Sequence, residues 1–522
     1  MHRSLHRSPG LLLVVLGCLL GSMGLAQEAP TGPIIELPRV VVTDSRDLPP
    51  PERWRYAEIP GFEVLTNASD RDTQKLIQDF QSFNFAVDVV WRGLQQKTGE
   101  PISLIICGRG GKFDAFAPRI GNSPDTGRAS LLLQEREKAA IVLDFQAKTI
   151  QLSNLADAPA GAPAPVAADA EAADADAAVP GANSGEMEVD AYKQLYREYL
   201  RHLMSRAQPR FPAWFEEGLA QLFMGMTFDS RTITFAKLED PNLASLSGGV
   251  EDRDFNKALE GRALMPLQEM FSIERGSSTA TNPLGSIWAK QSQAFVHLCL
   301  YGEGQRYQKG LITLLLRIQK EPVTEKLFRE CFNKSYQDML GILRGYQQFT
   351  AYKSLEWRLP KGQSIERPPL IALREATQAE IGRVKGEALR LAGQPAAAHT
   401  ALIAPYVRGE RDPRLLAALG LEELSAGHDD RAEKFLTAAT TAKVERPRAY
   451  LELARIRYQA SLAAASTTGD RFSDEQVSQI MAPLLVGRTQ SPALPEIYEL
   501  MSDTLVRGAN VPAKETIALL YD

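Results

Sequence analysis

The chain has 522 residues, of which 44% are hydrophobic and 24% are charged, and its formal net charge is −5. This length exceeds what one hydrophobic core supports, so two to four domains are expected. The apolar content excludes a wholly disordered or fibrous chain. The acidic balance argues against a nucleic-acid-binding protein, which needs a basic face. Four cysteines are too few for a disulfide scaffold.

Residues 1–26 have the layout of a secretory signal peptide. Two arginines precede the apolar run Leu11–Leu20, and Gly24 and Ala26 supply the small residues that favour a cut before Gln27. The apolar run is too short to span a bilayer. The sequence therefore predicts an exported protein, either periplasmic or extracellular.

An alternative is a lipoprotein cut that leaves Cys18 lipidated, but the leucines on both sides of Gly17-Cys18 fit that pattern poorly. No later segment reaches ~18 apolar residues, so we expect no membrane-spanning segment in the mature chain. Three cysteines follow the leader, Cys107, Cys299 and Cys331, and each lies in an apolar run. We therefore expect them to be buried free thiols.

Residues 27–53 are proline-rich and are expected to form an N-terminal tether, and the globular part begins at Trp54. Apolar patterning predicts strands at 62–65, 103–107, 130–133, 140–144 and 149–152, the last three as a meander. Helical periodicity predicts helices that begin at Asp70, near Tyr192 and near Pro212, and further helices at about 287–301, 306–319, 322–331 and 335–349.

Residues 156–184 differ abruptly in composition from their surroundings. Fourteen of these 29 residues are alanine, and the segment contains no lysine, arginine or aromatic residue. Such a composition cannot bury enough apolar area to offset the entropy of ordering. We expect a disordered surface insertion.

The C-terminal part, residues 370–522, contains a repeat and follows an expected linker at 356–369. Gly386, Gly420 and Ala454 are spaced 34 residues apart. This period of small residues resembles that of tetratricopeptide (TPR) repeats, in which paired helices pack closely. A plain array of helical hairpins is the alternative. TPR-like arrays bind peptides or proteins, so a protein or peptide partner is expected here.

Two adjacent segments resemble a known family. Residues 196–203 read YREYLRHL, and residues 211–220 read FPAWFEEGLA. Together they resemble the peptidase-MA-like gluzincin domains of exported bacterial proteins, whose pattern is H-E-x-x-H, about 15 residues, then P-x-W-x-x-E-G-x-A. The segments that begin at Phe62, Met265 and Trp288 resemble family segments in the same order, so the resemblance covers about residues 54–350.

The resemblance implies the fold class. We expect an α+β chain in which residues 54–355 form a gluzincin metallopeptidase-like domain with a small mixed or antiparallel sheet and helices. An all-α TPR-like domain follows it.

In that family, two histidines one helical turn apart bind zinc, the glutamate after the first histidine is the general base, and the glutamate of W-x-x-E-G is the third ligand. Here the histidine positions hold Arg197 and Arg201, the base position holds Glu198 and the third-ligand position holds Glu217. A guanidinium group has no lone pair to donate, so neither arginine binds zinc. His202 lies one residue out of register, about 100° around the helix.

One alternative is that Arg197 and Arg201 are solvated residues on a polar helix face. The resemblance favours a vestigial metal site instead. Without zinc, a buried Glu217 would lack its counter-charge, which is costly. We therefore predict that at least one arginine pairs with Glu217, with a nitrogen–oxygen distance within ~3.2 Å.

The functional prediction is a non-catalytic, peptidase-like scaffold of the cell envelope without metal or cofactor. It would bind a protein or peptide through the repeats, the former cleft, or both. The alternative is a hydrolase with a rearranged site that uses Glu198 and Glu217. His297 has no partner histidine at useful spacing and is expected to be a satisfied helix histidine, and His399 and His428 lie in the repeats, where neither suggests chemistry.

Overall fold

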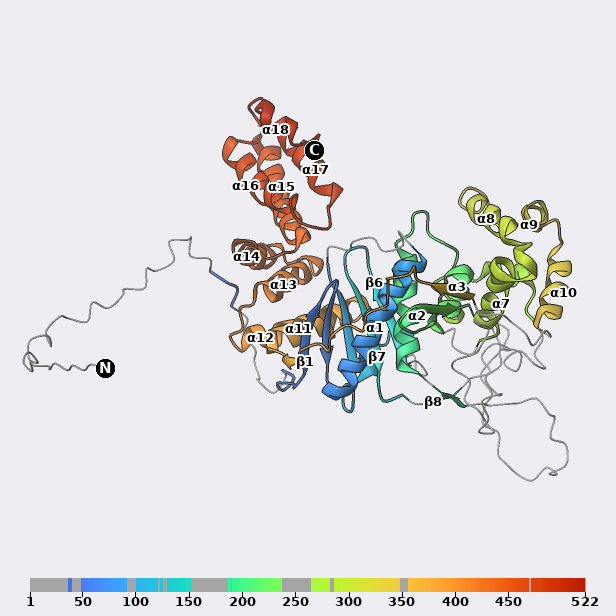
Figure 1. Cartoon of the computed structure of the whole chain (residues 1–522). Coiled ribbons are helices and arrows are strands. Elements are labelled where there is room, and N and C mark those ends of the chain that lie inside the picture. Colours follow the sequence, from blue (N-terminus) through green and yellow to red (C-terminus); the bar gives the residue numbers. More distant parts are fainter. Residues whose placement is uncertain are drawn as a thin grey trace, which may run out of the picture.

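A computed structural model describes residues 36–39, 48–91, 100–120, 123–124, 129–147, 149–151, 186–188, 190–236, 264–281, 286–347, 355–468 and 471–521. The expected signal peptide, the expected insertion at 156–184 and most of the expected tether lie outside these ranges. Within the described ranges, no helix is both long enough and apolar enough to cross a membrane. The chain is an α+β protein, as the sequence predicts (Figure 1).

A six-stranded mixed sheet forms the centre of the N-terminal part, in the order β13-β1-β2-β3-β7-β6. Strand β3 pairs in parallel with both β2 and β7, and the other neighbours are antiparallel. The strands of this sheet are β1 (Arg55–Ile59), β2 (Phe62–Thr66), β3 (Ile102–Cys107), β6 (Ser130–Gln134), β7 (Ala139–Asp144) and β13 (Arg374–Glu375).

Smaller sheets flank this core. A three-stranded sheet contains β10 (Thr227–Phe228), β11 (Thr232–Phe235) and β12 (Leu355–Arg358). Two-stranded pairs are formed by β4 (Arg119–Ile120) with β5 (Ser123–Pro124), and by β8 (Thr149–Gln151) with β9 (Glu186–Glu188).

Helices make up most of the remaining described chain. The N-terminal helices are α1 (Asp70–Val90), η2 (Phe113–Phe116), α2 (Ala191–Ser205), α3 (Ala213–Met224), α5 (Leu267–Ser272), α6 (Ser278–Thr281), α7 (Ile287–Tyr301), η4 (Glu303–Gln305), α8 (Gln308–Arg317), α9 (Glu325–Phe332) and α10 (Tyr336–Gln347). The C-terminal helices are α11 (Gln378–Leu391), α12 (Pro395–Val407), α13 (Pro413–Ser425), α14 (Asp429–Thr441), α15 (Pro447–Thr468), α16 (Asp474–Gly487), α17 (Pro495–Arg507) and α18 (Lys514–Ala518).

Both faces of the central sheet are covered, which explains why β3 is apolar along nearly its whole length. Leu104 and Ile106 point to the side of α1 and α2, where they share a core with Phe80. Ile105, between them, points to the opposite side and packs in a core with Val384 of α11. Helix α11, the first helix of the C-terminal part, therefore covers one face of the N-terminal sheet (Figure 1).

Local signals set the starts of the helices that position the candidate site. The side chain of Ser69 accepts a hydrogen bond from the backbone N–H of Asp72 and caps α1. Asp190 caps α2 through the N–H of Tyr192. Pro212, with its fixed φ, stands immediately before α3.

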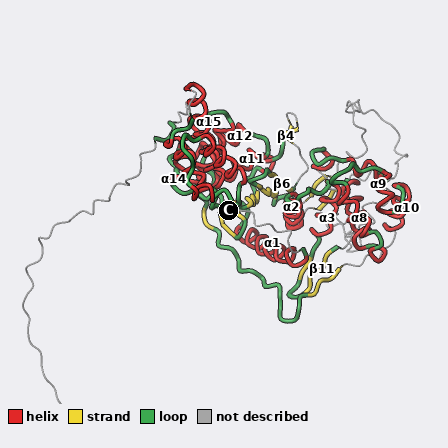
Figure 2. The backbone as a smooth tube through the Cα atoms, turned by 90° about the horizontal axis from the view of Figure 1, so that it is seen from above, coloured by secondary structure: helices red, strands yellow, loops and turns green. Residues whose placement is uncertain are grey.

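Two expectations about strands are corrected by the structure. Residues 130–133 and 140–144 form an antiparallel pair, but residues 149–151 leave that sheet and pair with β9, so the three strands are no meander. The local sequence of a strand does not specify its partner. The expected linker at 356–369 begins within β12, which pairs with β11. The chain that follows β12 runs along the outside of the molecule to the repeats (Figure 2).

Helical hairpins follow in the C-terminal part, in pairs α11–α12, α13–α14 and α15–α16. The prediction that Gly386 and Gly420 lie at tight helix contacts is confirmed. A Cβ atom at Gly386 would come within 2.6 Å of Cγ of Leu402, and one at Gly420 within 2.7 Å of Cγ of Leu436. The 34-residue period therefore corresponds to the same contact in two successive hairpins.

A buried ion network joins the hairpins to the sheet. Glu63 of β2 accepts from Arg383 of α11 at 2.5 Å and from Lys138, in the β6–β7 turn, at 3.0 Å. Glu387 of α11 accepts from Arg446 at 2.5 Å, and its carboxylate lies 3.6 Å from Lys138 Nζ. Burial raises the pKa of Glu63, but Arg383 and Lys138 outweigh burial and hold it well below its usual value. The charges stay ionised where the two parts of the chain meet.

Cys107, Cys299 and Cys331, the cysteines of the described residues, are free thiols. Cys107 and Cys299 are buried, as expected, whereas Cys331 is only half-buried. Burial raises the pKa of Cys107 to about 12, which keeps this thiol protonated and unreactive.

Candidate functional site

The four positions that the sequence singles out, Arg197, Glu198, Arg201 and Glu217, lie on α2 and α3, which pack against each other beside the edge of the sheet formed by β6. Arg197, Glu198 and Glu217 are each about 98–99% buried, and Arg201 is 80% buried at its side chain. The alternative of solvated arginines is therefore excluded for Arg197.

Arg197 pairs with Glu217 through a bidentate fork. Its Nε donates to Oε1 of Glu217 at 3.0 Å, and its Nη2 donates to Oε2 at 2.8 Å. This geometry confirms the predicted pairing within ~3.2 Å. Planar guanidinium and carboxylate groups match in such a pair, so it is both strong and directional.

Glu198, at the position of a general base, is engaged from three sides. Its Oε1 accepts from Nη1 of Arg197 at 2.6 Å and from the hydroxyl of Ser130 at 2.9 Å. Its Oε2 accepts from Nη1 of Arg201 at 3.0 Å. These three bonds occupy most of the roughly four lone-pair sites that a carboxylate has for accepting a proton from water.

Glu217 is stabilised in its ionised form. Burial raises its pKa, but the charges of Arg197 and Arg201 outweigh burial and hold the pKa below its usual value. Arg201 adds a longer ion pair, with its Nε 3.8 Å from Oε2 of Glu217. The arginines thus provide the positive charge that a metal ion provides in the family that the sequence resembles.

A series of polar contacts leads from Glu217 to α7. Gln221, one turn after Glu217, donates to Oε1 of Glu217 at 2.8 Å and accepts from Lys290 of α7 at 3.2 Å. Gly218 permits this approach, because a Cβ atom there would lie 2.6 Å from the backbone oxygen of Ser292. Glycine at this position is therefore required by the packing of α3 on α7.

Sequence reasoning missed three members of the network, Ser130, Gln221 and Lys290. Ser130 and Lys290 are distant in sequence from α3, so no local pattern links them to Glu217. The sequence did contain one signal for Lys290. Lys290 is the only acidic or basic residue, histidine aside, in the apolar helix α7.

Two of the segments that resemble the family outside α2 and α3, those that begin at Met265 and Trp288, come together around α3. Trp214 packs in edge or tilted contact with Phe271 of α5 and with Phe295 of α7, at ring distances of 5.0 and 5.6 Å. Phe271 also contacts Phe295. These aromatic rings hold α3 in place behind the arginine–glutamate pair.

Two histidines near the site have different surroundings. His202 is buried, and no hydrogen-bond partner is found for either ring nitrogen among the described residues; burial lowers its pKa to about 4. His297 is also buried, with hydrogen bonds to the hydroxyl of Tyr346 and the backbone oxygen of Ala236. Neither imidazole reaches the carboxylate of Glu198 or Glu217 with a hydrogen bond in the described structure.

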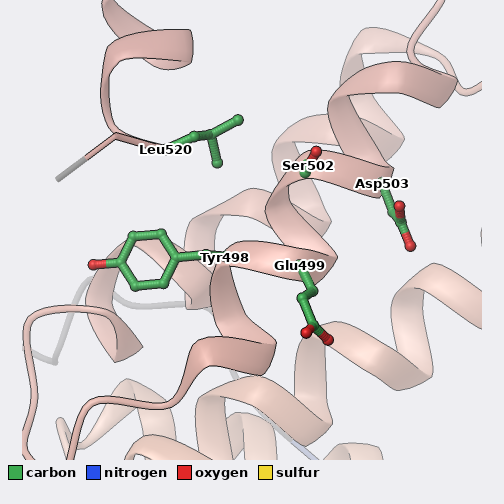
Figure 3. A pocket seen from close by; sticks show the side chains of 5 residues that line it. All are labelled: Tyr498, Glu499, Ser502, Asp503 and Leu520. Atoms are coloured by element: carbon green, nitrogen blue, oxygen red, sulfur yellow. The ribbon is translucent and has the colours of Figure 1, made fainter.

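A separate hollow lies at the far end of the repeats (Figure 3). It has a volume of about 540 Å³ and is lined by Tyr498, Glu499, Ser502 and Asp503 of α17 and by Leu520. It contains no member of the arginine–glutamate network.

No family model, curated protein or solved structure gives a significant match. The gluzincin-like and TPR-like interpretations therefore depend on the residues and the geometry described above.

Proposed function

We propose that the protein is an exported, non-catalytic, peptidase-like scaffold that binds a protein or peptide through its C-terminal helical repeats. The bidentate pair between Arg197 and Glu217 is the observation that carries this proposal. It occupies the third-ligand carboxylate with a permanent positive charge, where a gluzincin would hold zinc.

The alternative, a hydrolase that uses Glu198 and Glu217, requires one carboxyl group that can hold a proton and one that can reach water. Both carboxylates are 98–99% buried, and both are bonded to arginine. A raised pKa marks a carboxyl group suited to general-acid chemistry, whereas the pKa of Glu217 is lowered. These properties favour the scaffold over the hydrolase.

The repeats are favoured over the former cleft as the binding surface, because the residues at the centre of the cleft are buried and bonded to one another. The first helix of each hairpin already makes contacts within the protein, because each forms an ion pair with the sheet or its turns. These pairs are Arg390–Glu135 (α11), Arg414–Glu58 (α13) and Arg448–Glu137 (α15). Helix α17, which follows the third hairpin, makes one such contact at its start, between Glu496 and Arg136.

The last part of the array is more open. Val506 of α17 and Val511 after it are 71% and 92% exposed, and Leu485 and Val486 of α16 are also exposed. Exposed apolar side chains on neighbouring helices are typical of protein-binding surfaces. We infer that the partner contacts α16, α17 and the hollow beside them.

Site-specific photo-crosslinking in the producing cell tests the proposal. A photoreactive residue at the exposed Asp503 should give a discrete adduct, whereas the same residue at the exposed Lys75 of α1, the matched control, should give none. In parallel, the purified chain should not hydrolyse peptides. Hydrolysis that disappears in Glu198→Gln or Glu217→Gln would refute the non-catalytic assignment, and identical adducts at both positions would refute the binding surface.

A further inference from the structure

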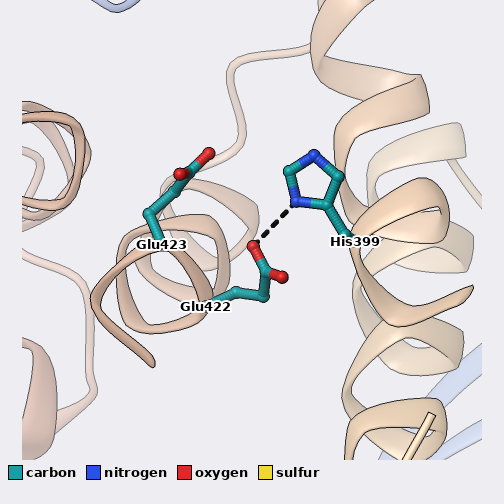
Figure 4. A group of neighbouring side chains, drawn as sticks. All are labelled: His399, Glu422 and Glu423. Atoms are coloured by element: carbon teal, nitrogen blue, oxygen red, sulfur yellow. Dashed lines mark hydrogen bonds and ion pairs between the residues drawn. The ribbon is translucent and has the colours of Figure 1, made fainter. Parts of the chain in front are cut away.

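A second group of histidine and glutamate side chains lies within the repeats, away from the arginine–glutamate network. His399 of α12 and the consecutive residues Glu422 and Glu423 of α13 each offer one ligand atom, and these atoms all lie within 4.8 Å of one another. Nδ1 of His399 is 2.9 Å from Oε2 of Glu422 (Figure 4). This group could not be seen in the sequence, because His399 lies more than 20 residues before the two glutamates and meets them only when α12 packs against α13.

A second imidazole adjoins the group. His428, at the start of α14, has its Nδ1 2.8 Å from Oε2 of Glu423. Two imidazoles and two carboxylates are thus connected by two short contacts, one on each glutamate. This set of nitrogen and oxygen donors is the type that binds Zn²⁺ with four ligands, whereas Mg²⁺ and Ca²⁺ prefer oxygen donors alone.

The two glutamates are buried and the two histidines are partly exposed, an arrangement that suits an ion entering from solvent. Glu422 and Glu423 have side chains that are 9% and 0% exposed, while His399 and His428 are 39% and 54% exposed. The carboxylates are therefore fixed by the helix packing, and the imidazoles can adjust by rotation. We propose that His399, Glu422, Glu423 and His428 form a binding site for a divalent zinc-type cation that links the first two helical hairpins.

Arg431 competes with such an ion for the carboxylate of Glu423. Its Nη2 lies 2.5 Å from Oε1 of Glu423, and its side chain is 39% exposed. A guanidinium and a divalent cation compete for the same carboxylate, because each supplies the positive charge that the buried Glu423 requires. Unlike Arg197, Arg431 has an open path to solvent, so it can leave Glu423 when an ion binds.

This site is independent of the proposed scaffold function. It does not involve Glu198 or Glu217, and a zinc ion with four protein ligands is structural because it keeps no open position for water. Its expected effect is to fix α12, α13 and the start of α14 relative to one another.

Isothermal titration of the chelator-treated full chain with Zn²⁺ tests the proposal, with Mg²⁺ as the comparison ion. We expect about one Zn²⁺ per chain and no comparable binding of Mg²⁺. His399→Ala, and separately His428→Ala, should weaken binding by about tenfold or more. Arg431→Ala should strengthen it severalfold, since the competing cation is removed. Both histidines are partly exposed, so these variants should keep the helical circular dichroism of the parent.

Glu217→Gln distinguishes this site from the former metal position and should leave Zn²⁺ binding unchanged. Zn²⁺ binding that is absent from the parent chain, or that is insensitive to His399→Ala, would overturn the inference. Binding that is lost in Glu217→Gln and kept in His399→Ala would overturn it as well, and would also count against the non-catalytic assignment.

Discussion

At the scale of single residues, the exchange of imidazole for guanidinium on α2 changes what Glu217 can do. A neutral imidazole carries no charge to balance a buried carboxylate, whereas Arg197 carries a permanent positive charge and five donors. Three of those donors are used here, two on Glu217 and one on Glu198. The cluster is therefore complete without an ion.

Removal of Arg197 should be strongly destabilising. Arg197→Met leaves the buried Glu217 without its main counter-charge, so we expect a loss of ~3–5 kcal/mol in the free energy of unfolding. Arg201→Met is the matched control. Its side chain is 20% exposed and its contact with Glu217 is longer, so its loss should be smaller. Urea denaturation monitored by fluorescence measures both, and equal losses would contradict the central role of Arg197.

Buried histidines should make the protein sensitive to mild acid. Burial lowers the pKa of His202 to about 4 from a usual value of 6.5, and the pKa of His297 is also lowered to about 4. The unfolded chain then binds more protons than the folded chain between these values, so stability falls as the pH falls below 6.5. Each histidine should contribute a loss of about 1.5 kcal/mol between pH 6.5 and pH 5.

His202→Leu tests this linkage. The variant should lose stability less steeply over that pH interval, because one of the two buried histidines no longer titrates. Denaturation curves at several pH values provide the slope. A slope that equals that of the parent chain would show that His202 is not buried as a neutral group.

At the scale of elements, the 34-residue period makes a specific prediction about helix packing. Gly420→Leu should destabilise the chain by ~1–3 kcal/mol, because Leu436 already fills the space that a side chain needs. Gly345→Ala in α10 is the control, since a Cβ atom there meets nothing within 4 Å. That change should be neutral or stabilising, as alanine favours helix. Thermal unfolding of the two variants gives the comparison, and a neutral Gly420→Leu would mean that the repeat register is wrong.

The elements that the sequence could predict are those with a local cause. The apolar run of β3, the Ser69 cap of α1 and the whole of α7 were predictable from composition, capping and periodicity. The partner of β8 and the place of β12 were not, because strand pairing depends on residues far away in the chain. At the site, the pairing of Arg197 with Glu217 followed from the resemblance and from charge, while Ser130 and Lys290 entered through tertiary packing alone.

At the scale of the whole molecule, the repeats and the sheet belong to one packed structure. Helix α11 covers one face of the sheet, and the network of Glu63, Lys138, Arg383, Glu387 and Arg446 is buried between them. A boundary drawn at residue 370 therefore cuts through a core.

A fragment that contains only residues 370–522 should fold poorly at its beginning. It exposes the apolar face of α11, including Ile381 and Val384, and it leaves Arg383 without Glu63. We expect it to bind a hydrophobic dye and to associate in size-exclusion chromatography. A fragment that begins at Pro413 lacks α11, so it should bind less dye and associate less. Monomeric, dye-free behaviour of the longer fragment would contradict a shared core.

We propose that the pair of Arg197 and Glu217 occupies the position of a former zinc site. Zinc binding by the double variant Arg197→His, Arg201→His tests it most directly, in a background with His399→Ala and His428→Ala so that the repeats contribute no ligands. We expect about one Zn²⁺ per chain, absent from the parent background and lost again when Glu217→Gln is added. A folded double variant that binds no Zn²⁺, or that binds it regardless of Glu217, would contradict the account.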